Sequence, residues 1–255
     1  MSRIFSSLLT VRVTVAYASA LFVIASALLA LGPNVQDHVV RQLSTNLHNL
    51  GHGHLGTLVG SAFVTVDGQA YLLLPGLVCL LTLAELLWRS RWLVQAFALG
   101  HVGATLVVAA GLATAIKSGW LPISMAGVTD VGLSYGAVAV LGTLTAAIPA
   151  RWRPAWLAGW VTVASVMVVA SAGDFTAVGH TVALVLGMLL SLRLRMRMPW
   201  TKPRWALLAA AIGFGLLLLV GVSLPMAPLA VSAGLAVALL TRLVTRLLMP
   251  SGVSA

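Results

Sequence analysis

The apolar segments of this chain constrain its fold more than any other feature. They cover residues 11–32, 71–88, 92–116, 130–149, 155–172, 174–192, 205–224 and 227–248. A helix needs about 20 apolar residues to cross the hydrocarbon core of a bilayer. The runs are too long for strands and lack the alternation of a transmembrane β-barrel. We therefore expect an all-α polytopic membrane protein with eight spans.

The composition excludes a soluble globular enzyme. Hydrophobic residues make up 60% of the 255-residue chain and charged residues only 8%, whereas soluble domains carry about 25% charged residues. The first apolar segment is longer than the core of a signal peptide, which has about 7–15 residues, so we interpret it as an anchor. The single cysteine, Cys79, rules out an internal disulfide. Any chemistry must then lie between helices or in the loop 33–70.

The basic residues predict the orientation. The net charge is +10, and 13 of the 15 Lys and Arg residues fall on one side of the predicted membrane, with only Arg41 and Lys117 on the other. Cytoplasmic loops collect Lys and Arg, so both termini are expected in the cytoplasm. The strong bias toward Arg, Ala, Val, Leu and Gly is typical of a high-GC bacterial genome, so we expect a protein of the bacterial plasma (inner) membrane. The basic run 193–204 is interpreted as an anchor for anionic lipid, and no nucleic-acid partner is expected.

A basic, proline-containing linker divides the chain. We expect a six-span core over residues 1–198, with the external loop 33–70. Residues 199–255 are expected to hold the linker and a C-terminal hairpin of two spans, which turns near Pro225 and Pro228.

Two polar residues at similar depth suggest a reactive pair. Ser134 lies 17 residues above the inner Arg151, and His180 lies 13 residues above Arg193. At 1.5 Å per residue, these separations correspond to roughly 25 and 20 Å. Both side chains are thus predicted in the outer half of two parallel helices.

Small residues predict that these helices touch. Gly132 and Gly136 are four residues apart on the first helix, and Gly179, Ala183 and Gly187 form a row on the second. Small residues let helices approach closely in lipid. A neutral imidazole beside a serine can take its hydroxyl proton during attack on a carbonyl. The pair also has simpler interpretations, since serine often packs membrane helices and a buried histidine is often structural.

These motifs resemble the rhomboid family of intramembrane serine proteases. Gly132-Leu-Ser134, with Gly142 eight residues later, is similar to the family's active-site helix, and Gly179-His180 with Ala183 and Gly187 resembles its sixth helix. The stretch Leu58–Phe63, and Glu85 with Arg89 and Arg91, also resemble parts of that core. The resemblance covers roughly residues 10–195. It implies a six-helix core in which Ser134 is the nucleophile and His180 the general base. Its substrates would be peptide bonds in or near a client's transmembrane helix.

Some family features are missing. The family usually carries a histidine and an asparagine on the second helix to complete the oxyanion hole, where this chain reads Gly68-Gln-Ala-Tyr71. Gln69 or Tyr71 are the available substitutes. Tyr135 replaces the usual glycine after the serine, and Val138 replaces a common tyrosine. The alternatives are therefore a catalytically inactive rhomboid-like protein that binds client transmembrane helices and, third, a small-solute transporter.

The remaining polar residues have structural interpretations. Asp130 and Asp174 are predicted to be helix N-caps, with a role beside the dyad or in water entry as the alternative. His48, His52 and His54 lie in the outer loop, where a metal site is disfavoured by Gly51 and Gly53. His101 paired with His180 would suggest haem, but their predicted depths differ. No metal or other cofactor is expected, and the expected partners are membrane lipids and client transmembrane proteins.

Overall fold

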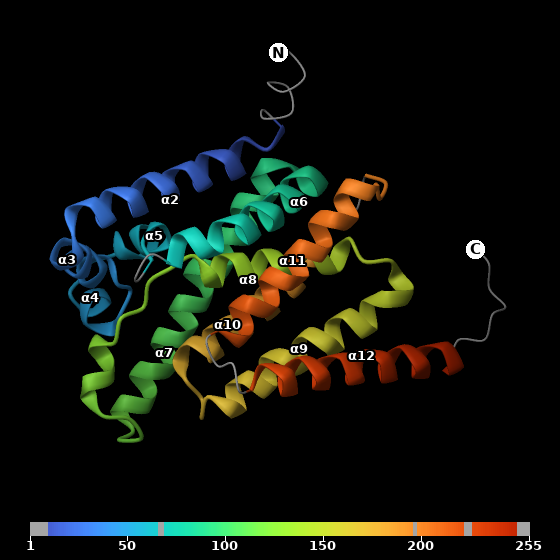
Figure 1. Cartoon of the computed structure of the whole chain (residues 1–255). Helices are drawn as coiled ribbons and strands as arrows, with labels where there is room; N and C mark the ends of the chain where they lie inside the picture. Colours follow the sequence, from blue (N-terminus) through green and yellow to red (C-terminus); the bar gives the residue numbers. More distant parts are fainter. Residues whose placement is uncertain (1–9, 66–68, 196–197, 222–225, 249–255) are drawn as a thin grey trace, which may run out of the picture.

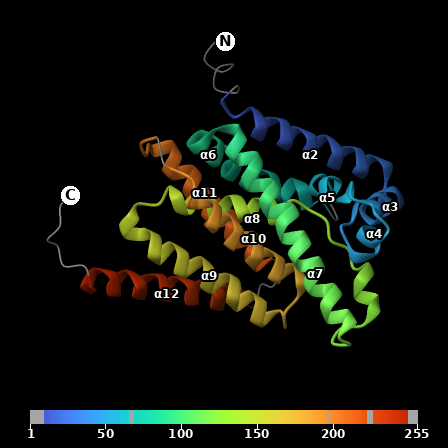
Figure 2. The same ribbon diagram turned by 180° about the vertical axis from the view of Figure 1, so that it is seen from behind.

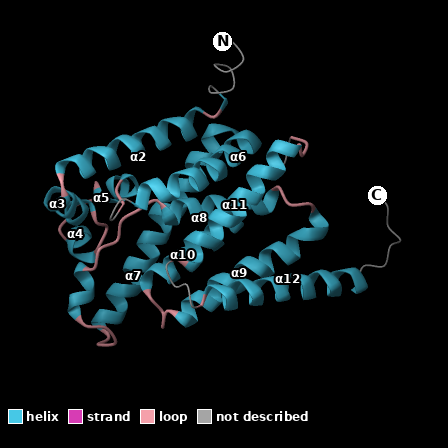
Figure 3. Ribbon diagram, viewed as in Figure 1, coloured by secondary structure: helices cyan, strands magenta, loops and turns pink. Residues whose placement is uncertain are grey.

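The computed structural model describes residues 10–65, 69–195, 198–221 and 226–248, and these contain helices and loops but no strand (Figure 3). Every predicted apolar segment contains a helix. Within the described part of the chain, five helices are long and apolar enough to span a membrane: Arg12–Leu31, Gln69–Lys117, Ala150–Ala170, Lys202–Val220 and Ala227–Leu248. Ser134–Ala146 and Phe175–Ser191 are shorter apolar helices. The count of eight spans and the orientation of the termini stay predictions.

The longest helical segment contains two of the predicted spans. Helix α6 (Gln69–Ala98) bends at Arg89, whose backbone adopts a left-handed φ of 70°. It continues through a π-helical turn, η2 (Leu99–Gly103), into α7 (Ala104–Lys117). Figure 2 shows α6 doubling back and α7 extending away from it. The apolar segments 71–88 and 92–116 therefore lie in two helices that meet at the non-helical kink at Arg89.

Helix α8 (Ser134–Thr143) lies at the centre of the molecule, with α6, α10 and α11 around it (Figure 1). Its residues 137–141 are fully buried. The short side chains of this helix, mainly Ala, Val and Gly, let its neighbours approach on every side. The hydrophobic core of the protein is built around α8.

Glu85 fixes the start of the first described helix, α2 (Arg12–Leu31). Its buried carboxylate accepts hydrogen bonds from the backbone N–H groups of Val13 and Thr14 and from the Thr14 hydroxyl. Ser90 donates a further bond to the same carboxylate. A carboxylate at a helix N-terminus satisfies N–H groups that have no partner within the helix. Glu85 thereby joins α2 to the bend of α6.

The predicted external loop 33–70 contains short helices. These are α3 (Pro33–Leu43), α4 (Leu47–Gly51), α5 (Thr57–Gly60) and the 3-10 turn η1 (Ser61–Phe63). Asn49 holds this region together, because its side chain donates to the carbonyls of Arg41 and Ser44.

The remaining helices complete the bundle: α9 (Arg153–Ala170), α10 (Phe175–Ser191), α11 (Lys202–Val220) and α12 (Ala227–Leu248). Helix α11 packs on α6, where Gly76 leaves room for Phe214, and α12 runs along α9, where Gly159 and Gly234 meet. The last two helices contact the core more than they contact each other (Figure 1).

Candidate functional site

Ser134 is the first residue of α8. The prediction of a helix from residue 130 is wrong by one turn, because Gly132 has a φ of +120° and its N–H donates to the Ser61 carbonyl. A positive φ of this kind favours glycine. The serine side chain is half-buried. Ser134 therefore lies at the N-terminal end of α8 instead of one turn inside a helix.

Helices α8 and α10 touch backbone to backbone. A Cβ on Gly187 would collide with the Ala139 carbonyl, and one on Gly142 would collide with the backbone of Leu184 and Gly187. Ala183 is fully buried. The small-residue row of α10 thus lies on the contact face. Gly132 and Gly136, the small residues expected on the facing side of α8, do not lie on this contact face. Gly136 packs against Phe97 instead of α10, and Gly132 precedes the helix.

His180 and Tyr135 face each other across this contact. Their ring centroids are 5.4 Å apart at an interplanar angle of 85°, an edge-to-face arrangement. Tyr135 fills the space beside Gly179, where any Cβ would collide with its ring. Both side chains are buried, 8% exposed for His180 and 4% for Tyr135. The residue that follows Ser134 is therefore the one that packs against the imidazole.

Two polar atoms in this contact lack partners. Within the described protein, neither the His180 Nε2 nor the Tyr135 hydroxyl has a hydrogen-bond partner. The Nε2–Ser134 hydrogen bond of a preformed dyad is therefore not made in this structure. Most buried polar groups are hydrogen-bonded, and an unpartnered one calls for an explanation such as catalysis.

Asp174 and Asp130 differ in whether they cap a helix. Asp174 is the N-cap of α10, as predicted, and accepts from the N–H groups of Thr176 and Ala177. Its carboxylate is within electrostatic reach of both Tyr135 and His180. The N-cap prediction for Asp130 is wrong, because Leu133 holds that position. Asp130 lies in the preceding loop, where its N–H donates to Ser44 Oγ and burial raises the pKa of its carboxyl to about 6.

A protein-family model described as "Rhomboid-like protein" matches residues 10–198, which is more than half of the chain. The chain belongs to the rhomboid-like family. Together with its apolar helices, this membership identifies it as a multi-pass rhomboid-like membrane protein. No curated protein and no solved structure matches the chain.

The two substitutes considered for the oxyanion hole of this rhomboid-like protein differ in place. Tyr71 lies against α2, where its hydroxyl shares a hydrogen bond of 2.9 Å with Ser26 and its ring meets Phe22. Gln69 is exposed at the first turn of α6. The Tyr71 hydroxyl is thus engaged on the α2 side. The Tyr135 hydroxyl, by contrast, is a buried donor with no hydrogen-bond partner among the described residues.

A second serine–histidine pair was not foreseen. Ser61 Oγ lies 3.0 Å from His101 Nε2, and both side chains are buried. The sequence singled out His101 and the stretch Leu58–Phe63 that contains Ser61, but the 40-residue separation of the pair gave no sign that the two residues meet. Ser61 is 0% exposed, so its hydroxyl is closed to a substrate in this structure. The pair ties the loop before α6 to the π-helical turn, and Gly100 of that turn packs on Ala139 of α8.

His48 and His52 lie next to each other with their rings tilted by 46°. The rings of His48 and His52 are 4.4 Å apart, and His52 Nδ1 lies 2.7 Å from the His48 carbonyl oxygen. His54 lies farther away, with its ring centroid 6.4 Å from that of His52. Among the described residues, no group of three or more His, Cys, Asp or Glu side chains is placed to hold a metal ion.

Proposed function

We propose that this rhomboid-like protein is an intramembrane serine protease in which Ser134 is the nucleophile and His180 the general base. Its substrates would be peptide bonds in or near the transmembrane helices of client proteins. It would act in a bacterial plasma membrane, with both termini in the cytoplasm and the site reached from outside.

One observation carries this proposal. The rings of His180 and of Tyr135, the residue after the half-buried Ser134, pack edge to face, and neither His180 Nε2 nor the Tyr135 hydroxyl has a hydrogen-bond partner among the described residues. Leaving such atoms unpaired costs free energy, about 1–3 kcal/mol for each group. A substrate that brings a carbonyl oxygen and a reacting hydroxyl into this space would satisfy both atoms.

The chemistry would follow from these positions. Rotation of the Ser134 side chain toward His180 lets Nε2 take the hydroxyl proton while Oγ bonds to the scissile carbonyl carbon. The C–N bond then breaks, and His180 passes the proton to the leaving amine. Water, deprotonated by His180, hydrolyses the acyl-serine and restores the hydroxyl. The Tyr135 hydroxyl would donate to the oxyanion in place of the absent histidine and asparagine.

The second candidate function is client binding without catalysis. The missing Ser134–His180 hydrogen bond and the replacement of the usual oxyanion donors favour it. A rhomboid-like core that holds a client helix needs the bundle but not an activated serine.

Reconstitution in proteoliposomes separates the two functions. A model client, a single transmembrane helix with a fluorophore on one side and a quencher on the other, is expected to be cut by the wild type. It should stay intact with folded Ser134→Ala and His180→Ala variants. Co-purification of uncut client with the wild type, without cleavage, would instead support the binding function.

A further inference from the structure

A cavity lies at the other end of the molecule from Ser134. It has a volume of about 470 Å³ and is formed by two segments far apart in the sequence, the bend of α6 and the chain that follows α10. Small-molecule sites occupy about 300–1,000 Å³. Its lining residues are Leu86, Leu87, Trp88, Arg89, Arg91, Trp92, Arg193, Leu194, Arg195 and Met198.

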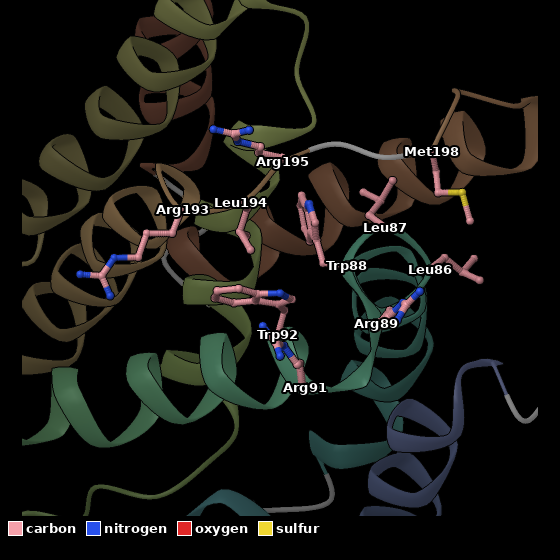
Figure 4. Close-up of a pocket in the computed structure, with 10 residues that line it drawn as sticks. All are labelled: Leu86, Leu87, Trp88, Arg89, Arg91, Trp92, Arg193, Leu194, Arg195 and Met198. Atoms are coloured by element: carbon pink, nitrogen blue, oxygen red, sulfur yellow. The ribbon is translucent and has the colours of Figure 1, made fainter.

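The cavity is basic at its rim and apolar at its floor. All four arginines are exposed, whereas Leu87, Trp88 and Leu194 are buried. Figure 4 shows the two indole rings between Arg91 and Arg195 in this view. The Arg91 guanidinium lies 5.2 Å from the centroid of the Trp92 ring. Charged heads above an apolar floor match a molecule with an anionic group and a hydrocarbon part.

The described residues around this cavity offer no free acidic side chain to its arginines. None of the ten lining residues is acidic. Glu85, four residues before Arg89, already accepts hydrogen bonds from Val13, Thr14 and Ser90. Asp130 and Asp174 precede α8 and α10, whereas Arg193 follows the end of α10. The positive charge of the cavity is thus left for an external anion.

The apolar floor of the cavity contains a buried hydrogen-bond donor, the indole N–H of Trp88. Trp88 is only 6% exposed, and its Nε1 has no hydrogen-bond partner within the described protein. Arg89, the next residue, is held with a φ of 70°, a region in which a residue other than glycine is strained. This bend sets Trp88, Arg89 and Arg91 around one space.

We propose that this cavity binds the phosphate-bearing headgroup of an anionic phospholipid. Arginines of the rim contact the phosphate, the Trp88 N–H donates to one of its oxygens, and the apolar floor packs against the start of the acyl chains. Arginine guanidinium groups match phosphate geometry. The cavity lies at the end that the arginine distribution assigns to the cytoplasm, where basic pockets between membrane helices bind anionic headgroups.

Native mass spectrometry of the full chain in detergent tests this proposal, with phosphatidylglycerol and phosphatidylcholine as probes. The wild type is expected to bind phosphatidylglycerol more tightly than phosphatidylcholine. Arg91→Gln/Arg195→Gln, which removes one arginine from each side of the cavity, should weaken phosphatidylglycerol binding roughly tenfold. Trp88→Phe, which keeps the ring but lacks the N–H, should weaken it by a smaller factor.

The matched control is Arg151→Gln/Lys202→Gln, which removes two charges at the same end outside the lining. It should bind phosphatidylglycerol as the wild type does, and Arg91→Lys/Arg195→Lys should retain part of the binding. Equal affinity for the two lipids, or equal losses in the cavity and control variants, would overturn the proposal. Displacement of the lipid by inorganic phosphate at similar concentration would reject a lipid ligand in favour of soluble phosphate. Thermal unfolding verifies that each variant is folded.

Discussion

Tyr135 connects the proposed chemistry to the stability of the core. Its ring fills the space that Gly179 leaves open, and its hydroxyl stays unpartnered beside His180. A buried hydroxyl without a partner destabilises the folded state. Retaining such a group is consistent with a role for the hydroxyl in binding or catalysis.

The Tyr135→Phe variant separates these two effects. It keeps the ring against His180 and removes only the hydroxyl. We expect the free energy of unfolding to rise by about 1–3 kcal/mol and cleavage of the model client to fall by about 10²-fold, as for loss of an oxyanion donor. Thermal unfolding and the proteoliposome assay measure the two quantities. Unchanged cleavage would remove Tyr135 from the mechanism.

Replacing Asp174 by asparagine removes its negative charge and keeps the N-cap of α10. Asparagine caps helices about as well as aspartate, so Asp174→Asn keeps the bonds to Thr176 and Ala177. The proposed imidazolium form of His180 loses a nearby negative charge, and we expect cleavage to fall about fivefold, or ~1 kcal/mol. Asp37→Asn on the exposed face of α3 is the control. Equal activity of both variants and the wild type would show that Asp174 only caps α10.

Some residues of the candidate site could be predicted from the sequence, and others could not. Ser134 and His180 could be selected because few polar side chains lie at matching depth in apolar helices. Tyr135 was noted as a departure from the family pattern, but nothing in the sequence showed that its ring packs on His180. The Ser61–His101 contact was hidden too, because it joins a loop to a helix through the folded structure.

At the scale of elements, the α8–α10 contact determines whether the site exists. Gly187→Ala introduces a methyl group into the Ala139 backbone. We expect it to separate the helices, lower the free energy of unfolding by about 1–3 kcal/mol or more and abolish cleavage. Gly213→Ala on α11 is the control, since nothing lies within 4 Å of its Cβ position. That change should be neutral or stabilising by up to about 1 kcal/mol. Equal changes in the free energy of unfolding for Gly187→Ala and Gly213→Ala, measured by thermal unfolding, would contradict the close packing of α8 on α10.

Helix boundaries show what the apolar pattern can and cannot determine. The first and last residues of α2 and α12 fall within a residue of the predicted segments, because the apolar runs and the helices have the same limits. The start of α8 was missed by four residues, since Asp130 and Gly132 adjoin an apolar run yet hydrogen-bond to Ser44, Thr45 and Ser61 of the outer loop. Those partners lie about 70 to 90 residues away in sequence, beyond any local pattern.

At the scale of the whole molecule, the arginine distribution predicts the orientation. In a Cys79→Ala background, a cysteine at His52 should react with a membrane-impermeant maleimide added to intact cells. A cysteine at Lys202 should react only after permeabilisation. Gel-shift labelling measures both. The reverse pattern would invert the topology, placing Ser134 on the cytoplasmic side and the basic cavity outside.

The central claim is that His180 activates Ser134, and covalent labelling by a fluorophosphonate probe tests it most directly. The wild type in detergent should be labelled, and Ser134→Ala and His180→Ala should not. Ser61→Ala and His101→Ala provide the matched serine–histidine control and should keep labelling wherever they remain folded. Labelling that survives in Ser134→Ala, or is lost in Ser61→Ala with an intact fold, would contradict the account and place the nucleophile elsewhere.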